Sequence, residues 1–477
     1  MTNMPFGFSQ GEPEDPDKRG ENEQGPQQGG FGFGALPGGM PGMPGMGGPG
    51  GENFDVGQLG QMLSQLGQML SNAGTSSGPV NYDLAKQIAV QQLTNAAGLA
   101  GADQQKAVTD SMHLAEMWLD PVTTLPVGAR EISSWSARDW VEHTLETWQR
   151  LCDPVAQRMS GAWVEALPEE AKQAAGALLG MLGQMGGMAF GSQLGNALAQ
   201  LGSEVLTSSD VGLPLGKPAT AALLPANIER FTEGLERPAS EVMVFLAARE
   251  AAHQRLFEHV PWLRERLLST VEEFARGITV DTAALEELAG QIDPNNPASI
   301  EQAMSSGMLE PKQTPEQEAA LTRLETLLAL VEGWVDVVVS EAVGERLPGA
   351  NALRETLRRR RASGGPAEHT FATLVGLELR PRKLRAASGL WKLLGDRLGI
   401  EERDKLWSHR DLLPTAEDLD NPTDFVDRLA GAEAGSDEFT IPDDPIAAIK
   451  QAEREEQAAK DKNEDEDEDD EKPGEQD

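Results

Sequence analysis

Apolar residues recur every three or four positions along most of the middle of this 477-residue chain. The stretches FDVGQLGQMLSQLGQML and SARDWVEHTLETWQRLCDPVAQRM follow this spacing, which places their apolar side chains on one face of a helix. Alternating runs of β-branched residues, which would indicate strands, are nearly absent, and tyrosine occurs once. The chain is therefore predicted to be mainly α, with few or no strands.

The overall charge is strongly negative, with a formal net charge of −37 at pH 7. Such a surface repels nucleic acid and anionic lipid on average, so a nucleic-acid partner is not expected. Cys152 is the single cysteine, which excludes an intrachain disulfide and a cysteine-rich zinc site. The opening residues lack the apolar core of a signal peptide, and we therefore expect a cytoplasmic protein.

Both ends of the chain have the composition of disordered segments. Residues 1–52 are rich in Gly, Pro and Met and have no periodic apolar face, and residues 441–477 contain the acidic run EDEDEDDE. Between these ends we distinguish a helical N-terminal part, residues 53–220, from a second helical part, residues 221–440. The second part carries the candidate site residues described below.

One segment, residues 174–202, has no charged residue and is long enough to cross a membrane. Polar amides recur along it, however, and a glycine falls on every fourth position of one helical stripe: Gly183, Gly187, Gly191 and Gly195. Glycines at this spacing let another helix approach closely. We therefore expect a buried helix or helical hairpin, and no membrane span.

Two arginine-rich runs stand out from the acidic background, RRRR at Arg358–Arg361 and RPRKLR at Arg380–Arg385. The ordinary interpretation is a solvated helix face that balances nearby acids. The alternative is a local site for an anion.

The stretch LAAREAAHQRLFEHVPWL, residues 246–263, nearly matches a zinc-protease helix. In the motif H-E-x-x-H, two histidines one helical turn apart bind zinc and the glutamate acts as general base. Here Arg249, Glu250 and His253 give R-E-x-x-H, so an arginine occupies the first histidine position. Because Arg249 and His253 share a helical face with apolar residues, the guanidinium of Arg249 needs an anionic partner or a route to solvent.

A second predicted helix supplies a candidate partner. In LETLLALVEGWVDVVVSEAV, aliphatic residues form a stripe, Glu332 lies beside that stripe and Asp336 follows one turn later. A carboxylate flanked by aliphatic side chains must be satisfied by a cation, a metal or a hydrogen-bond donor. Glu332 is therefore predicted to bind either a metal or Arg249.

These segments together resemble the zincin-like family of zinc-dependent metalloproteases and hydrolases, a sister branch of which is associated with deazaflavin cofactor biosynthesis. The resemblance covers residues 80–435 and rests on REAAHQRLFEHVPWL, LALVEGWVDVVVSEAVGERLPGANALRETLRRRR, LVGLELRPRKLR and WSHRDLLPTAEDLDNPTDFV. It implies a zincin-like helical domain, a zinc cofactor and hydrolase activity.

The resemblance also implies roles for individual residues. Glu250 would be the general base, and His253 and Glu332 would be metal ligands. The third protein ligand is missing, because a guanidinium stays protonated and has no lone pair for zinc. His259 lies about 240° around the helix from His253, which makes it no substitute. The remaining histidines are His113, His143, His369 and His409.

Three interpretations of this altered motif remain open. In the first, zinc binds through His253, Glu332 and a distant ligand, and the protein is a hydrolase of reduced activity. In the second, Arg249 pairs with Glu332 in place of the metal, and the protein is a non-catalytic pseudoenzyme that binds or scaffolds a protein or peptide partner. In the third, the three residues have only structural roles.

Overall fold

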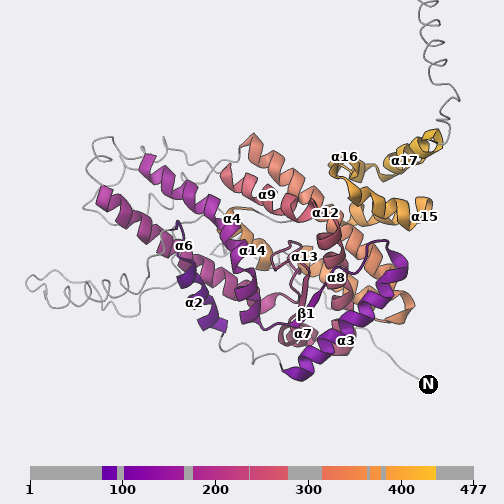
Figure 1. Ribbon diagram of the computed structural model, residues 1–477, viewed down its shortest axis with the longest axis horizontal. Coiled ribbons are helices and arrows are strands. Elements are labelled where there is room, and N and C mark those ends of the chain that lie inside the picture. Colours follow the sequence, from indigo (N-terminus) through magenta and orange to yellow (C-terminus); the bar gives the residue numbers. More distant parts are fainter. Residues whose placement is uncertain are drawn as a thin grey trace, which may run out of the picture. The chain divides into compact units, whose positions relative to one another are not determined.

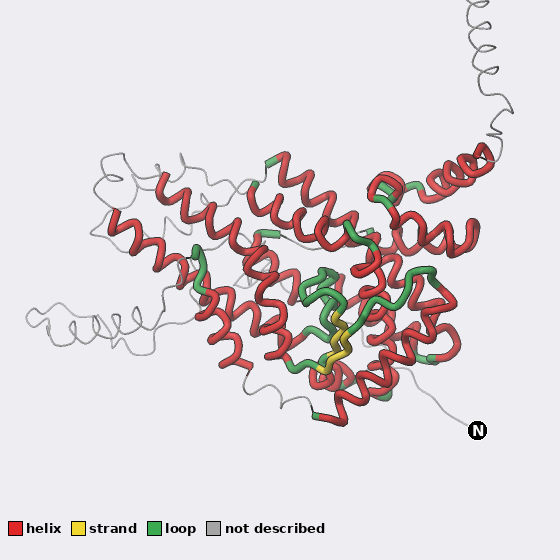
Figure 2. Tube along the Cα trace, viewed as in Figure 1, coloured by secondary structure: helices red, strands yellow, loops and turns green. Residues whose placement is uncertain are grey.

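The computed structural model describes residues 78–93, 101–165, 176–235, 237–277, 314–362, 366–377 and 383–436. Helices make up 78% of the interpretable part of the chain, which confirms the predicted mainly α fold (Figure 2). The α-helices are α2 (Tyr82–Leu93), α3 (Ala102–Leu119), α4 (Ala137–Glu165), α6 (Gly176–Glu204), α7 (Pro225–Thr232), α8 (Ala239–His259), α9 (Leu263–Arg276), α12 (Pro315–Val343), α13 (Ala350–Ala362), α14 (Pro366–Val375), α15 (Leu384–Lys405), α16 (Ala416–Asp420) and α17 (Pro422–Ser436). The 3-10 helices are η1 (Asp120–Val122), η2 (Gly344–Arg346), η3 (Leu406–Ser408) and η4 (Arg410–Leu412), and the strands are β1 (Glu131–Ser134) and β2 (Thr220–Leu223).

The terminal segments that were predicted to be disordered, residues 1–52 and 441–477, lie outside the described residues. All the described residues fall in one compact unit. Within it, α3 and α4 from the predicted N-terminal part pack on α8 and α9 from the predicted second part (Figure 1). The boundary near residue 220 stays a prediction.

Helix α12 is buried along most of its length and carries Glu332 into the protein interior. It begins with a capping box, in which the Thr314 hydroxyl accepts from the Gln317 amide, and its C-cap is Gly344, with a φ of +39°. Its aliphatic residues pack against α8, α9 and α15. Gly333 allows the approach of α15, because a Cβ at this position would lie 2.7 Å from the Ala387 Cβ.

The uncharged segment forms one helix, α6, which packs closely on α2 as its glycine stripe predicted. A Cβ at Gly191 would lie 2.4 Å from the Asn81 carbonyl oxygen, and a Cβ at Gly195 would lie 2.6 Å from the Ala85 carbonyl oxygen. Only glycine permits this contact between backbones. Among the helices that the structure describes, none has the length and hydropathy needed to span a membrane.

The two strands pair in parallel, with Glu131 opposite Thr220 (Figure 2). The segment before β2 also pairs with it: Thr207 forms an antiparallel bridge with Leu223, and the Ser208 amide donates to a β2 carbonyl at 2.9 Å. This small sheet holds the segment 207–212 in place. Ser208 and its neighbour Ser209 contact α8 there.

Candidate functional site

Helix α8 holds the altered motif inside the protein. Its centre is rich in alanine, which favours a helix and leaves room for close neighbours. Glu250 is fully buried and His253 is 2% exposed. Arg249 lies at the margin, with 11% of its side-chain surface exposed. The predicted burial of His253 is thus confirmed, and Arg249 is mostly buried as well.

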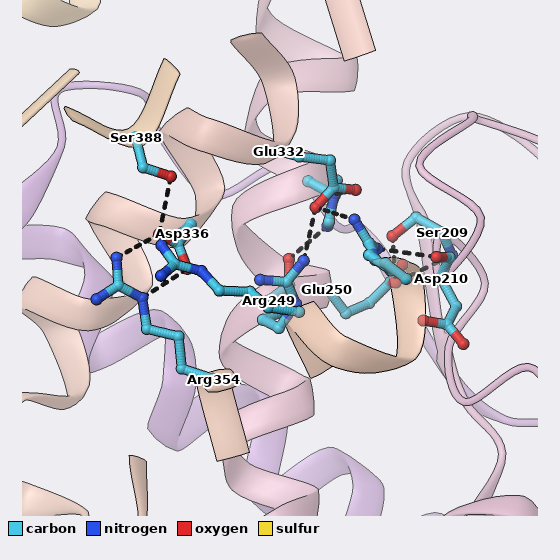
Figure 3. A network of polar contacts seen from close by, with 11 residues as sticks. Ser209, Asp210, Arg249, Glu250, Glu332, Asp336, Arg354 and Ser388 are labelled. Atoms are coloured by element: carbon cyan, nitrogen blue, oxygen red, sulfur yellow. Dashed lines mark hydrogen bonds and ion pairs between the residues drawn. The ribbon is translucent and has the colours of Figure 1, made fainter. Parts of the chain in front are cut away.

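Glu332 of α12 stands at the centre of the site, where it meets three cationic or hydrogen-bonding side chains (Figure 3). Its Oε2 accepts from Nη2 of Arg249 at 2.7 Å and also pairs with the guanidinium of Arg361. Its Oε1 lies 3.0 Å from Nε2 of His253. The pairing of Arg249 with Glu332 that the sequence indicated is therefore present.

The ring of His253 is held at both nitrogens. Its Nδ1 lies 2.8 Å from the backbone carbonyl oxygen of Arg249, and its Nε2 faces Glu332. The backbone carbonyl accepts a hydrogen bond from Nδ1, which fixes the orientation of the ring and directs Nε2 toward the carboxylate of Glu332.

The electrostatic surroundings keep Glu332 ionised. Burial by itself would raise the pKa of this carboxyl group. The charges of Arg361, His253 and Arg249, with a hydrogen bond from His253, outweigh burial and hold the pKa well below its usual 4.5. The buried carboxylate thus has its charge balanced by the protein's own cations.

Glu250, the predicted general base, is hydrogen-bonded to residues other than Glu332. Its Oε1 accepts from the Ser208 hydroxyl at 2.5 Å and from Nε2 of Gln254 at 2.9 Å. Its Oε2 accepts from the Ser209 hydroxyl at 2.5 Å and from the Ser209 amide at 3.1 Å. The three hydrogen bonds from Ser208 and Ser209 fasten α8 to the segment 207–212, and with the bond from Gln254 of α8 itself they occupy both oxygens with donors from the protein.

A second buried carboxylate, Asp336, lies one turn after Glu332 on α12 (Figure 3). Arg354 of α13 donates from Nε to its Oδ1 at 2.7 Å and pairs with its Oδ2 as well. Nη2 of Arg358 donates to Oδ2 at 2.5 Å, and the Ser388 hydroxyl donates to Oδ2 at 2.9 Å. Burial opposes ionisation of Asp336, but Arg354, Arg358 and Arg249 together lower its pKa.

The run Arg358–Arg361 is mostly turned inward, and its interpretation as a solvated helix face is wrong for three of the four residues. Arg360 donates from Nη1 to Oδ2 of Asp210 at 3.0 Å, and Arg361 donates from Nη2 to the Asp210 backbone oxygen at 2.9 Å. Only Arg359 fits the solvated face, where it pairs with Glu355. The RPRKLR run falls partly outside the described residues.

Helix α13 was not predicted to lie at this site. A signal was present, however: Arg354, Arg358 and Arg361 are spaced by four and three residues, which puts them on one helical face. A face with three arginines that follows a helix with two buried acids indicates interhelical ion pairs.

The side chains at this site do not fit a zinc ion. Within the described part of the chain, no three His, Cys, Asp or Glu side chains lie together in an arrangement that could hold a metal. None of the other histidines reaches the site: His143 stacks on Trp135, His259 faces the Val127 carbonyl, and His113, His369 and His409 are exposed. Two guanidinium groups on the one carboxylate also repel a divalent cation.

Comparisons with known protein families and solved structures show which proteins are similar to this chain. The family model for zincin-like metallopeptidases matches residues 80–426. A search of curated proteins found no match. The chain is similar to a solved structure described as a putative hydrolase with a novel fold from Chloroflexus aurantiacus, with 20% sequence identity and a TM-score of 0.52. That similarity covers 74% of this chain and 99% of the other, and it shows a shared fold.

The family match extends over most of the chain and includes both helices of the site, α8 and α12, as well as the arginine helix α13. It agrees with the resemblance that the sequence motifs indicated. The chain belongs to the zincin-like metallopeptidase family.

Proposed function

We propose that this protein is a pseudoenzyme of the zincin-like metallopeptidase family, without zinc and without hydrolase activity, which acts by binding. The observation that carries the proposal is the double ion pair on Glu332, in which Arg249 and Arg361 supply positive charge at the family's metal-binding position. We further propose that its partner is a protein or peptide, the ligand class that the family name suggests.

The proposal has a physical basis in the charges of the site. A zinc ion and a pair of guanidinium groups both neutralise a buried carboxylate, but only the metal acts as a Lewis acid toward water or a carbonyl group. Arginine stays protonated at any physiological pH and offers no lone pair. The residues present therefore stabilise the fold at this position without providing the electrophile of a metallopeptidase.

The environment of Glu250 supports the same conclusion. A general base must reach the proton that it abstracts, directly or through one water molecule. Glu250 is fully buried and accepts four hydrogen bonds from Ser208, Ser209 and Gln254. This arrangement suits a structural carboxylate.

One observation favours the alternative function, a zinc-dependent hydrolase. Nε2 of His253 and Oε1 of Glu332 are 3.0 Å apart, and two ligands of one tetrahedral zinc ion stand about 3.3 Å apart. These two groups would need little movement to bind a metal if a third ligand were supplied.

The decisive experiment measures zinc per chain by mass spectrometry on protein purified without a His tag. We compare the wild type with R249H, which restores H-E-x-x-H, and with R249H/R361Q, which also frees Glu332. We expect no zinc in the wild type and about one zinc per chain in R249H/R361Q, because three ligands and an open position define a catalytic zinc site. Adding H253A to the double variant should remove that zinc.

Zinc in the wild type would instead support the interpretation of the protein as a zinc-dependent hydrolase. About one zinc per wild-type chain, lost in both H253A and E332A, would mean that a further ligand completes the site. A peptide-hydrolysis assay on the same samples then tests activity, with E250Q as the variant that should retain zinc and lose turnover.

A further inference from the structure

The arginines around Glu332 and Asp336 outnumber the carboxylates that they contact. Five guanidinium groups take part in ion pairs: Arg249, Arg354, Arg358, Arg360 and Arg361. Three carboxylates receive them: Glu332, Asp336 and Asp210. Among these eight groups the formal excess is two positive charges. This excess lies within a protein whose net charge is −37.

The excess produces repulsion within the cluster. Arg249 and Arg361 share the single carboxylate of Glu332. The two guanidinium groups carry two positive charges against the single negative charge of that carboxylate, and like charges this close repel each other. An additional negative charge at this position would relieve the repulsion.

Two of the five guanidinium groups use little of their hydrogen-bond capacity. In the described part of the chain, Arg249 makes one side-chain hydrogen bond, to Glu332, and Arg358 makes one, to Asp336. A guanidinium group has five N–H donors. The Nε of Arg358 is buried and has no partner among the described residues, which is costly for a polar group unless an acceptor is supplied.

These two arginines approach the same pair of carboxylates. Glu332 and Asp336 lie four residues apart on one face of α12. Arg249 donates a hydrogen bond to Glu332, and Arg358 donates one to Asp336. Arg249 keeps 11% of its side-chain surface exposed and Arg358 keeps 22%, so both side chains are partly in contact with solvent.

We propose that Arg249 and Arg358 form a binding site for a small oxyanion, the carboxylate or phosphate group of a ligand, above the Glu332–Asp336 face of α12. Both anion types present paired oxygens that match the planar fork of a guanidinium group. The proposal rests on the proposed function, because a zinc ion at Glu332 would displace Arg249. The proposal names the chemical class of ligand, an oxyanion, that the zinc-free site would bind.

The test uses the full chain and two probes, inorganic phosphate and acetate, titrated by isothermal calorimetry at constant ionic strength set with sodium chloride. The variant R358Q removes one fork of the site. R359Q is the matched control, since Arg359 is the next residue on α13 and pairs outward with Glu355. R358K keeps the charge but loses the fork, and it serves as the second variant if R358Q does not fold.

We expect one of the two anions to bind the wild type and R359Q equally, and to bind R358Q and R358K about tenfold or more weakly, because a hydrogen bond to a charged group is lost. Tighter binding of phosphate would identify a phosphate ligand, and tighter binding of acetate would identify a carboxylate ligand. Failure of both anions to bind beyond the chloride control, or equal weakening in R358Q and R359Q, would overturn the proposal.

Zinc is measured on the same samples so that the two proposals fail separately. Zinc in the wild type would overturn the proposed pseudoenzyme function. A zinc-free protein that binds neither anion would leave that function standing and would eliminate only the oxyanion site.

Discussion

At the scale of single residues, Glu332 decides what the site can do. A carboxylate with 2% exposure cannot remain charged without partners, and here those partners are Arg249, Arg361 and His253. The guanidinium groups balance the charge of the carboxylate, but a guanidinium group cannot polarise a bound water molecule as a metal ion does. The ion pairs of Glu332 can therefore stabilise the fold whether or not the site is catalytic.

The depressed pKa of Glu332 predicts how stability depends on pH. A carboxyl group whose pKa is lower in the folded than in the unfolded state stabilises the fold above the unfolded value, near 4.5, and that stabilisation is lost as pH falls through the folded pKa. We expect E332Q to cost about 3–5 kcal/mol at pH 7, because Arg249 and Arg361 lose their counter-charge. We also expect the stability of E332Q to fall less steeply than that of the wild type below pH 4.5.

Urea unfolding at a series of pH values measures both effects. E355Q is the control, because Glu355 forms an exposed pair with Arg359 and should change stability by less than about 1 kcal/mol. Parallel pH profiles for E332Q and the wild type would contradict the assignment of this titration to Glu332.

At the scale of elements, the site is made where three helices meet the segment before β2. Helix α8 brings Arg249 and His253, α12 brings the two acids, and α13 brings the arginines of its inner face. Local interactions favour each helix, such as the capping box at Thr314 that stabilises the N-terminus of α12. The ion pairs then fix how the helices are placed relative to one another.

The packing of α6 on α2 gives a prediction at this scale. A Cβ at Gly195 would lie 2.6 Å from the Ala85 carbonyl oxygen and 2.9 Å from the Ile88 Cβ. G195A should therefore destabilise the protein by about 1–3 kcal/mol, as expected for overpacking against backbone that cannot move aside. Differential scanning calorimetry measures the change.

Gly186, in the same helix, provides the control, because a Cβ at this position would meet no neighbouring atom within 4 Å. G186A should stabilise the protein by up to about 1 kcal/mol, since alanine has the higher helix propensity. If both variants shift stability in the same direction, the difference does not arise from the contact between α2 and α6.

At the scale of the whole described unit, Asp404 connects segments that are far apart in the sequence. Its Oδ2 accepts from the Thr123 hydroxyl at 2.6 Å across 281 positions, and from the Thr124 amide at 2.8 Å. Its Oδ1 accepts from Nε1 of Trp334 and from Nε of the buried Arg403, both at 2.9 Å. A single carboxylate thus joins η1, α12 and the end of α15.

The variant D404N tests this connection. An amide keeps the size of the side chain but offers one acceptor oxygen and no charge, so at least one charged hydrogen bond is lost, at about 1.5–3 kcal/mol. We expect far-UV circular dichroism and tryptophan fluorescence to report one common, lowered unfolding midpoint. D396N, which removes an exposed pair with Lys392, should change stability by less than about 1 kcal/mol. Equal effects of the two substitutions would rule out a special role for Asp404.

Much of this organisation was predictable from local patterns. The helices on either side of the site, the glycine contact of α6 and the pairing of Arg249 with Glu332 all follow from residue spacing and from the need of a buried charge for a partner. The engagement of Glu250 by Ser208 and Ser209 was not predictable in this way. Those serines lie in a segment whose position depends on its pairing with β2.

The sequence by itself determined the mainly α character of this protein, its family and the presence of an arginine at the first histidine position of the H-E-x-x-H pattern. These properties depend on spacings of a few residues, because helical hydrogen bonds and motif geometry are local. Only the tertiary structure decided that Arg361 joins Arg249 on Glu332, and that Arg354 and Arg358 reach Asp336. Arg249 and Glu332 are 83 positions apart, and Arg360 and Asp210 are 150 apart. Which charges meet over such separations is set by the packing of whole helices, because each buried charge must find its counter-charge in the folded chain.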